Sequence, residues 1–420
     1  MHIRRGQVGG RQLGHHGVSG QTNGEQAKAD EDVERPEMTV LQYLRQAERE
    51  HHRGHRQQHV GLHVGHGTQL DMVELRGPHH VVELRTGFFN SEHGFIFQGK
   101  GAATQAWFPL SAFRFPLYFQ PMRYRTLGKT GLRPSVIGLG TWQFGGEWGV
   151  NFSQDQVDAI LDAAAGCGIN LIDTAECYGP DHLSEKFIGD YLSRHDRSRW
   201  LVATKFGHHF NSFMNRDDDF SVAGVLAQLE ASLKALRVET IDLYQFHSGS
   251  DALFQNEKLW TMLAEQKRAG KIRHLGVSIL QKGSKLQARE AAKFGAEMLQ
   301  VFYNRLDRRP EQLFFPHARE NHLGIIGRVP LASGLLTGKY KPGATFAAND
   351  VRSNFDAEKM KCDLAEIERL QKEEVPVGVP MANWAMAWCL QDPLVSSVIC
   401  GCKNPEQVKA NAQAAELVAE

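Results

Sequence analysis

The chain has 420 residues, 41% hydrophobic and 23% charged, and its 48 basic residues balance its 48 acidic residues. This composition is typical of a globular protein rather than of a fibrous or disordered chain. A net charge of zero argues against a nucleic-acid partner, because nucleic-acid-binding proteins are usually basic. No uncharged apolar run reaches the ~18 residues of a spanning helix, so we expect no membrane partner. The length allows two or three domains of roughly 150 residues, although an α/β barrel can take ~250 residues as one domain.

The cysteines neither pair as C-x-x-C nor accompany histidines at zinc-ligand spacing. In a long chain this pattern indicates free thiols in a reducing compartment, and we expect no metal site. Residues 1–20 lack the apolar stretch of a secretion signal, so the protein is predicted to be cytoplasmic. The six cysteines are Cys167, Cys177, Cys362, Cys389, Cys400 and Cys402.

Residues 1–121 differ in composition from the rest of the chain. They hold 12 of the 20 histidines and none of the cysteines, which places a boundary near Pro121–Met122. Metal binding is one interpretation of their His-rich tract. A disordered extension without function is favoured, because no apolar scaffold surrounds the tract to fix ligand geometry. Since Met122 resembles a domain start, the extension is also a candidate for a mis-assigned start codon. The tract consists of His51, His52, His55, His59, His63 and His66.

From Met122 onward, short apolar runs alternate with amphipathic stretches. One such stretch places Val225, Leu229, Leu233 and Leu236 at helical spacing. The predicted strands are 137–142, 170–174, 201–205, 241–246, 272–278, 298–303, 324–330 and 397–401. The predicted helices are 154–165, 222–236, 258–268, 285–294, 311–320, 381–390 and 405–415. This alternation predicts that residues 122–420 form an α/β fold, a (β/α)8 barrel.

An open doubly wound sheet is the alternative fold. It would require a G-x-G-x-x-G turn directly after its first strand. The sequence there is G-L-G-T-W-Q, with Gln143 in place of the third glycine, and the helical pattern begins only after Ser153. The dinucleotide fingerprint is therefore absent, and the barrel is the preferred interpretation.

Four chemically active residue types follow three neighbouring strands of the predicted barrel. Asp173 and Tyr178 follow the second strand, Lys205 ends the third, and His247 follows the fourth. In a barrel these strand ends meet at the mouth that carries the active site. An ammonium near a phenol favours the phenolate and lowers the phenol's pKa. Taken singly, each has an ordinary interpretation: a turn residue for Asp173, a rim aromatic for Tyr178, a solvated strand end for Lys205 and a structural histidine for His247.

Together the four residues form the apparatus of a carbonyl reductase. Tyr178 would protonate a carbonyl oxygen as hydride reaches the carbon, and Lys205 would assist it. Asp173 would keep Lys205 charged and in place, and His247 would donate a hydrogen bond to the same oxygen.

Several motifs in order resemble the aldo-keto reductase superfamily, from Met122 to about Ala415. The resemblance is closest to its bacterial and potassium-channel-β-like branch. R-T-L-G-K-T-G-L at 125–132 resembles the family's N-terminal hairpin, which plugs the barrel bottom, and G-L-G-T-W at 138–142 resembles its first strand. D-T-A at 173–175 with Y-G at 178–179 matches the signature that carries the catalytic tetrad. P-L-A-S-G-L-L-T-G-K at 330–339 resembles the cofactor loop after strand seven.

The resemblance implies NADPH-dependent reduction of an aldehyde or ketone, with NADP(H) bound extended across the barrel mouth. Lys403 would neutralise the 2′-phosphate, and the helix predicted to start at residue 405 favours an anion at its N-terminus. The cofactor-binding residues carried over from the family are Gly140, Thr141, Trp142, Asp173, Ser278, Gln300, Arg328, Pro330, Leu331, Gly334, Leu335, Lys339, Gly401, Lys403, Gln407 and Asn411.

The sequence departs from the family pattern at three places. Ile279 stands where the family often has Asn, so one partner of the nicotinamide carboxamide is either missing or replaced by a backbone group. Arg328 stands where the family often has an aromatic residue stacked on the nicotinamide, although a planar guanidinium can also stack on a ring. Cys400 replaces the proline of an I-P-G motif.

Two longer loops are expected around the mouth. The insertion 341–374, which holds Arg352, is expected to fold over the cofactor as a lid. The loop 208–220 is expected to shape the substrate pocket with Trp142, Trp148 and Tyr178, which favours a small apolar or aromatic carbonyl compound. This loop contributes His208, His209, Phe210 and Phe213.

Two other functions use the same residues. A slowly turning NADP(H)-binding redox sensor that regulates a partner is suggested by the resemblance to potassium-channel β subunits. A dehydrogenase oxidising a polyol or sugar would employ the same tetrad in reverse. No exposed stripe in the sequence predicts an oligomeric state.

Overall fold

The computed structural model describes residues 122–283 and 285–418 and, before them, the backbone of four short strands. The chain divides into two units, Met1–Tyr118 and Phe119–Glu420, close to the boundary expected from composition. No helix in the described part of the chain is long and apolar enough to cross a bilayer.

The first unit contains a small antiparallel sheet to which the sequence analysis assigned no element. Its strands are β1 (Gly61–Val64), β2 (Thr68–Gln69), β3 (Phe95–Gln98) and β4 (Gln105–Phe108), in the order β2-β1-β3-β4. Apart from the backbone of His63 in β1, the His-rich tract lies outside the described residues. Metal binding by that tract, a disordered extension and a mis-assigned start therefore stay predictions.

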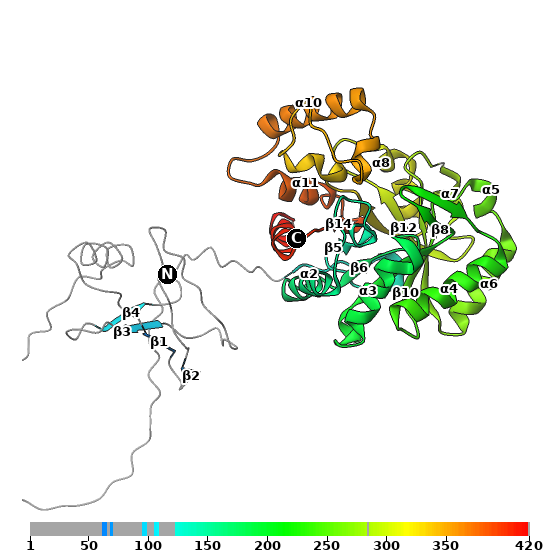
Figure 1. Cartoon of the computed structure of the whole chain (residues 1–420), viewed down its shortest axis with the longest axis horizontal. Coiled ribbons are helices and arrows are strands. Elements are labelled where there is room, and N and C mark those ends of the chain that lie inside the picture. Colours follow the sequence, from blue (N-terminus) through cyan, green and yellow to red (C-terminus); the bar gives the residue numbers. More distant parts are fainter. Residues whose placement is uncertain are drawn as a thin grey trace, which may run out of the picture. The chain divides into compact units, whose positions relative to one another are not determined.

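The second unit is a closed barrel of parallel strands in the order β10-β11-β12-β13-β14-β5-β6-β7, which confirms the predicted fold (Figure 1). The strands read as apolar runs because both of their faces are buried, one inside the barrel and one against helices. Every predicted strand is present, with its ends within two residues of the prediction. The strands are β5 (Ile137–Gly140), β6 (Leu171–Asp173), β7 (Leu201–Phe206), β10 (Ile241–His247), β11 (Ile272–Ser278), β12 (Ala296–Phe302), β13 (Gly324–Arg328) and β14 (Val395–Gly401).

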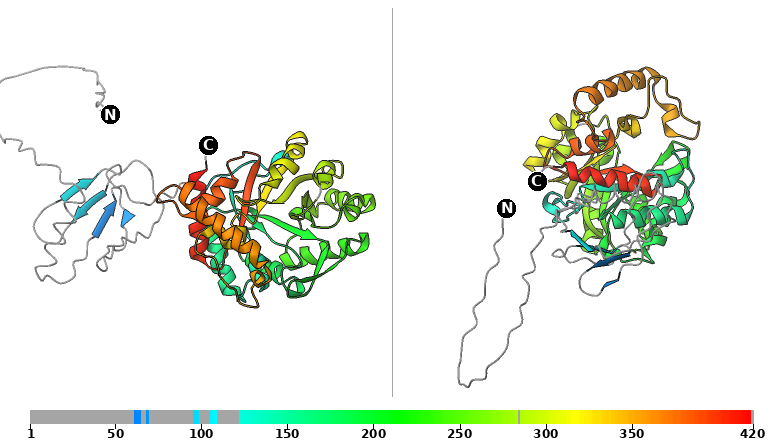
Figure 2. Two further views of the ribbon diagram at one scale, coloured as in Figure 1. Left: turned by 90° about the horizontal axis from the view of Figure 1, so that it is seen from above. Right: turned by 90° about the vertical axis from the view of Figure 1, so that its left-hand side faces the viewer.

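Helices surround these strands (Figure 2). The first of them begins at a capping box, in which Ser153 accepts from the backbone N–H of Gln156 and the Gln156 side chain accepts from the N–H of Ser153. The helices are α2 (Gln154–Gly166), α3 (Leu183–Leu192), α4 (Val222–Leu236), α5 (Asp251–Phe254), α6 (Glu257–Arg268), α7 (Lys285–Glu290), α8 (Arg309–Leu313), α9 (Phe315–Glu320), α10 (Ala357–Glu373), α11 (Met381–Cys389) and α12 (Pro405–Ala412).

An N-terminal hairpin closes the bottom of the barrel, as predicted. The backbone N–H of Leu127 donates to the carbonyl of Leu132 at 2.8 Å, and Tyr124 bridges Ser135 in antiparallel fashion. Both leucines are buried in one apolar cluster with inward-facing residues of six strands. The strand residues of this cluster are Leu171, Ala203, Leu243, Met298, Ile326 and Ile399.

Several elements of the barrel unit were not predicted, among them the helices α5 and α10. Helix α3 fills the gap between β6 and β7, and strands β8 (His208–Ser212) and β9 (Asn215–Asp218) form a hairpin after β7. The predicted helix 311–320 is two short helices, α8 and α9, because Pro316 in the first turn of α9 cannot donate an N–H to the preceding turn.

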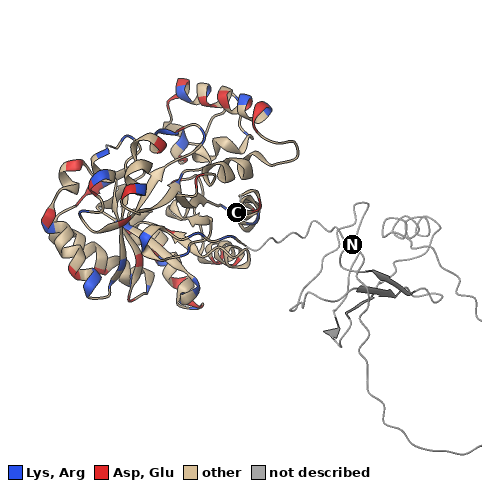
Figure 3. Cartoon of the chain, turned by 180° about the vertical axis from the view of Figure 1, so that it is seen from behind, with Lys and Arg blue, Asp and Glu red and all other residues tan. Residues whose placement is uncertain are grey.

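The insertion 341–374 is largely helical rather than an open loop. Helix α10 begins at Asp356, whose side chain accepts from the N–H of Lys359 at 2.6 Å, and it buries Leu364, Ile367 and Leu370. Its exposed face carries interspersed acidic and basic residues (Figure 3). Before α10, Asp350 pairs in β-bridge fashion with Trp148 in the loop after β5, so this part of the insertion runs beside the barrel mouth.

Candidate functional site

A cavity of about 720 Å³ lies at the carboxyl ends of the barrel strands. It extends from Tyr178 and His247 to Lys403 at the start of α12. Of the predicted cofactor residues, all line this cavity except Ser278 and Leu335, which are buried behind its wall. The fold therefore brings together residues that lie as far apart in the sequence as the first and last barrel strands.

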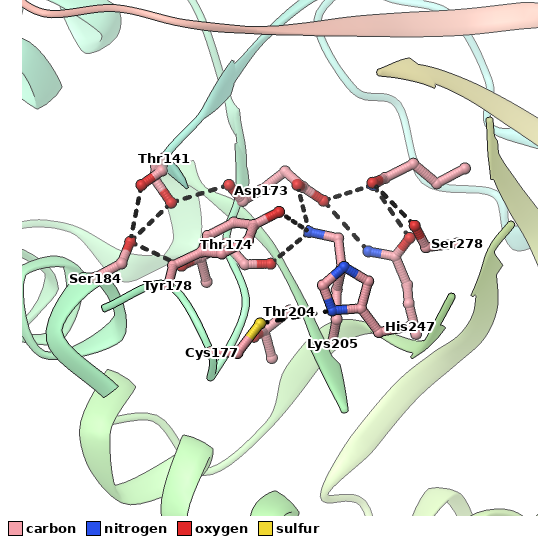
Figure 4. Close-up of polar contacts among 12 residues, drawn as sticks. Thr141, Asp173, Thr174, Cys177, Tyr178, Ser184, Thr204, Lys205, His247 and Ser278 are labelled. Atoms are coloured by element: carbon pink, nitrogen blue, oxygen red, sulfur yellow. Dashed lines mark hydrogen bonds and ion pairs between the residues drawn. The ribbon is translucent and has the colours of Figure 1, made fainter. Parts of the chain in front are cut away.

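The buried ammonium of Lys205 is the centre of the tetrad (Figure 4). Its Nζ donates to Oδ1 of Asp173 at 2.6 Å, to the backbone carbonyl of Thr174 at 2.6 Å and to the hydroxyl of Tyr178 at 3.3 Å. The side chain of Lys205 is completely buried, and that of Asp173 is 2% exposed. The lysine thus bridges a buried carboxylate and the phenol at the cavity wall.

Two amides hold the other oxygen of the carboxylate. Oδ2 of Asp173 accepts from Nε2 of Gln300 at 2.7 Å and from Nε2 of Gln245 at 3.3 Å. Ser278 in turn donates to Oε1 of Gln300 at 3.4 Å. Because both oxygens are satisfied, the carboxylate is fixed in position and its charge is directed at Lys205.

The electrostatics of the pair differ in part from the expectation. Burial would lower the pKa of Lys205, but the Asp173 carboxylate and Tyr178 outweigh burial and hold this pKa above its usual value. Burial also raises the pKa of Tyr178, and the Lys205 ammonium offsets only part of that rise. Lys205 does lower the phenol pKa as expected, but burial outweighs it, so the net pKa of Tyr178 is raised. At neutral pH the phenol is protonated and the lysine is charged.

His247 lies beside the phenol, with the two ring centroids 6.3 Å apart and the rings nearly perpendicular. Burial, followed by the positive charge of Lys205, holds its pKa well below the usual range, so the imidazole is neutral. Its Nδ1 lies 3.9 Å from Sγ of Cys177, and burial raises the pKa of that thiol to about 11. A protonated thiol can donate to Nδ1, which leaves the proton of the imidazole on Nε2.

The β8–β9 hairpin forms one wall of the mouth and contributes His208, Met214 and Arg216 to it. Of the other residues expected here, the ring of Phe210 packs under the Arg216 guanidinium, and Phe213 is 39% exposed.

Sequence reasoning missed the buried carboxylate that organises this wall, Glu147. It accepts from Nε1 of Trp142 and from the backbone N–H of Met214, both at 2.7 Å, and it pairs with Arg216. The carboxylate thereby connects the first strand's loop to the hairpin. No motif pointed to this residue, because two of its three partners, Met214 and Arg216, are distant in the sequence.

The far end of the cavity is basic. Nζ of Lys403 donates to the carbonyl of Trp148 at 2.5 Å and lies 4.0 Å from a carboxylate oxygen of Asp350. Arg352, which the sequence analysis placed in the insertion but did not assign to the cofactor, also lines the cavity and forms a two-point ion pair with Asp350. Lys339 completes this group of cations.

Glu176 is a buried acid beside the site. Its side chain is 3% exposed, and among the described residues neither carboxylate oxygen has a hydrogen bond or a lysine or arginine partner that would stabilise the ionised form, although Nδ1 of His209 lies 3.4 Å away. Burial, reinforced by the negative charges of Glu185 and Asp219, raises its pKa to about 9. The folded protein therefore holds this acid in its protonated form at neutral pH.

This raised pKa predicts a pH-dependent stability. Because the folded pKa of Glu176 exceeds the unfolded value of ~4.3, its stabilising contribution is present below that value and is lost as pH rises toward 9. Glu176→Gln is expected to raise the free energy of unfolding by ~2 kcal/mol or more at pH 8, and by little at pH 4. Urea unfolding across this range measures the difference. The exposed Glu239→Gln serves as control, and equal pH profiles for Glu176→Gln and the parent would contradict the assignment.

The fold and the polar groups at its mouth place the chain among the (β/α)8-barrel proteins that carry their site at the carboxyl ends of the strands. The model of the Aldo/keto reductase family matches residues 136–420. The chain belongs to this family and is an oxidoreductase of the aldo-keto reductase type.

Relatives and solved structures of the family span the barrel unit. Aldo-keto reductase YhdN of Bacillus subtilis is 32% identical over 296 residues, covering 69% of this chain and 87% of the relative. The NADH-specific methylglyoxal reductase of Escherichia coli is 32% identical, with 70% and 94% covered. The holo form of an aldo-keto reductase from Bacillus halodurans has a TM-score of 0.59 at 29% identity, with 70% and 91% covered. A putative voltage-gated potassium channel subunit beta of Schizosaccharomyces pombe is 28% identical, with 72% and 91% covered, which confirms the similarity to that branch.

Proposed function

We propose that this protein is an NADP(H)-dependent reductase that converts a small aldehyde or ketone to an alcohol by hydride transfer. The observation that carries the proposal is the buried Lys205 Nζ, bonded at once to Asp173 Oδ1 and to the Tyr178 hydroxyl. This arrangement supplies a protonated phenol with a cation beside it, which is what protonation of a carbonyl oxygen requires.

The cavity fits an extended dinucleotide. It runs from the tetrad to the cations at α12, and its wall includes Arg328, whose buried Nε has no hydrogen-bond partner among the described residues. Gln300 and Arg328 would hold the nicotinamide end, and Gly334, Lys339 and Lys403 would hold the phosphates. The remaining residues carried over from the family would line the space between them. When bound, the reduced nicotinamide supplies the hydride for the carbonyl carbon.

The chain's own residues then manage one proton. The Tyr178 hydroxyl donates its proton to the carbonyl oxygen, and the Lys205 ammonium stabilises the phenolate that remains. Asp173 keeps the lysine charged and in place. Neutral His247 donates from Nε2 to the same oxygen and orients the carbonyl, with the Cys177 thiol selecting the tautomer that has its proton there.

Consumption of NADPH with a panel of aldehydes and ketones tests the proposal. We expect reduction of small apolar or aromatic carbonyl compounds, because Trp142, Trp148 and Leu280 line the mouth. Methylglyoxal belongs in the panel, since one relative is named as a reductase of that compound. If the protein bound NADPH and reduced no carbonyl while oxidising a polyol or sugar, the reaction would run as a dehydrogenase. Binding without any turnover would favour a regulatory subunit. A cytoplasmic location stays a prediction.

Lys403 is expected to set the preference for NADPH over NADH. Lys403→Met should raise KM for NADPH at least ~10-fold and leave KM for NADH nearly unchanged, because only NADPH carries the 2′-phosphate. Steady-state kinetics with both cofactors measures the effect. Lys409→Met, on the helix α12 that follows Lys403 but exposed and outside the cavity wall, is the matched control. Equal losses with NADPH and NADH would contradict the assignment, and a parent that prefers NADH would overturn the choice of NADP(H).

A further inference from the structure

Arg328 is an unusual cation in the wall of the candidate site. It ends β13, and its guanidinium extends over the neighbouring β12 to the residue after β11, with its centre 5.5 Å from the ring centroid of Phe302 and Nη2 donating to the carbonyl of Ile279 at 3.2 Å. It lines the same cavity as Tyr178 and His247. Three neighbouring strands, β11, β12 and β13, thus converge on this one guanidinium.

Arg328 forms no ion pair among the described residues, and the Asp173 carboxylate, which is bonded to Lys205, favours its charge only from a distance. The Nε of Arg328 is buried and has no hydrogen-bond partner in the described part of the chain. In contrast, the other two arginines of the cavity are paired, Arg216 with Glu147 and Arg352 with Asp350. Burial lowers the pKa of Arg328, and Tyr178 and Asp173 offset only part of that effect. An arginine keeps its charge nevertheless, because its pKa starts far above neutrality.

The proposed function determines which part of the cofactor lies next to Arg328. A carbonyl oxygen in contact with Tyr178 and His247 places the carbonyl carbon inside the cavity beside them, and the hydride donor must lie against that carbon. Arg328 shares this part of the wall with Gln300 and Pro330, two residues carried over to the cofactor. The nicotinamide is therefore the ring that meets an unpaired guanidinium.

We infer that Arg328 makes the site distinguish the two redox states of its cofactor, an inference that rests on the proposed function. The oxidised nicotinamide ring carries a positive charge and the reduced ring carries none. Two like charges a few ångströms apart in a partly desolvated site repel each other strongly. Arg328 therefore weakens binding of NADP+ relative to NADPH. The consequence is a site that loads the reduced cofactor in competition with the oxidised one and releases the oxidised cofactor rapidly after turnover.

Calorimetric titration of the full chain with NADPH and with NADP+ tests the inference directly, without any turnover. We expect the parent to bind NADPH at least ~10-fold more tightly than NADP+. Arg328→Gln should bring the two Kd values within about threefold of each other, mainly by strengthening NADP+ binding. Arg328→Lys, which keeps the charge, should retain most of the preference. For a two-electron couple, each tenfold change in the Kd ratio corresponds to about 30 mV in the potential of the bound cofactor.

A ligand without a nicotinamide separates this effect from damage to the fold. 2′,5′-ADP carries the adenosine and its phosphate but no redox-active ring, so all three proteins should bind it equally. The double variant Arg216→Gln/Glu147→Gln, which removes a paired cation of the same wall together with its carboxylate, should leave the NADPH to NADP+ ratio as in the parent.

Three results would overturn the inference. The first is a parent that binds both redox states equally. The second is an Arg328→Gln variant that keeps the parent's ratio. The third is an Arg328→Gln variant that differs from the parent only in a raised KM for carboxylate-bearing aldehydes, with KM for neutral aldehydes unchanged. Arg328 would then face the substrate rather than the nicotinamide. The same experiments distinguish failure of this inference from failure of the proposed function. If neither dinucleotide binds, the function falls together with the inference, whereas binding without carbonyl reduction removes the function and leaves the titration ratio interpretable.

Discussion

Replacing Tyr178 with Phe is expected to lower kcat for carbonyl reduction by at least ~10²-fold, because the variant has no proton to give to the carbonyl oxygen. The ring and its packing remain, so NADPH binding should be unchanged. The effect should appear equally in kcat and in kcat/KM, which is the signature of an interaction made only in the transition state. Steady-state kinetics and an NADPH titration of the same variant measure both quantities.

Tyr191→Phe provides the matched control for this substitution. Tyr191 is also a buried phenol, but it lies on α3 and donates to Asp162 at 2.9 Å, away from the cavity. Its loss should affect stability slightly and leave kcat near that of the parent. A Tyr178→Phe protein with near-parental activity would mean that another group protonates the substrate, and the proposed mechanism would have to be abandoned.

Lys205→Met is the second substitution with a large expected effect, because it acts on both activity and stability. It removes the cation that stabilises the Tyr178 phenolate, so kcat should fall by at least ~10²-fold. It also leaves the Asp173 carboxylate buried without its countercharge. Breaking a buried pair in this way typically costs ~3–5 kcal/mol of unfolding free energy. Urea unfolding at pH 7 measures this loss.

The double variant Lys205→Met/Asp173→Asn separates the two effects. The neutral Asn needs no countercharge and can still accept one hydrogen bond from Gln300. We therefore expect it to recover most of the lost stability and none of the lost activity. If the single variant were as stable as the parent, the pair would not be the buried, desolvated unit that its 2.6 Å contact indicates.

The barrel strands were predictable because their pattern is local. Residues buried on both faces form continuous apolar runs, and each run ended at a glycine, a polar residue or a proline. Helix α3 was missed although Ile188, Tyr191 and Leu192 are spaced for a buried helical face. The β8–β9 hairpin gave no such signal, since its strands are polar and half exposed and their pairing depends on the barrel beneath them.

The candidate site was likewise predictable only in part. Asp173, Tyr178, Lys205 and His247 were found because consecutive parallel strands deliver their ends to one mouth, so strand order alone brings them near each other. The contacts among them, and the raised pKa of Tyr178, depend on burial that no spacing reveals. Three further groups were invisible for that reason: the Glu147 carboxylate, the protonated Glu176 and the Cys177 contact to the imidazole of His247.

The sequence by itself determined the barrel, the strand ends that carry the polar residues, and the family to which the chain belongs. These follow from periodicity and from motifs a few residues long, which are properties of neighbouring positions. Tertiary structure alone decided which charges are paired and which are left unpaired in the cavity wall. Arg216 and Arg328 are the same residue type in the same cavity, yet Arg216 pairs with a carboxylate and Arg328 pairs with none in the part of the chain that the structure describes. That difference arises from where distant segments meet, and it sets the desolvation and Coulomb energies on which the site's chemistry depends.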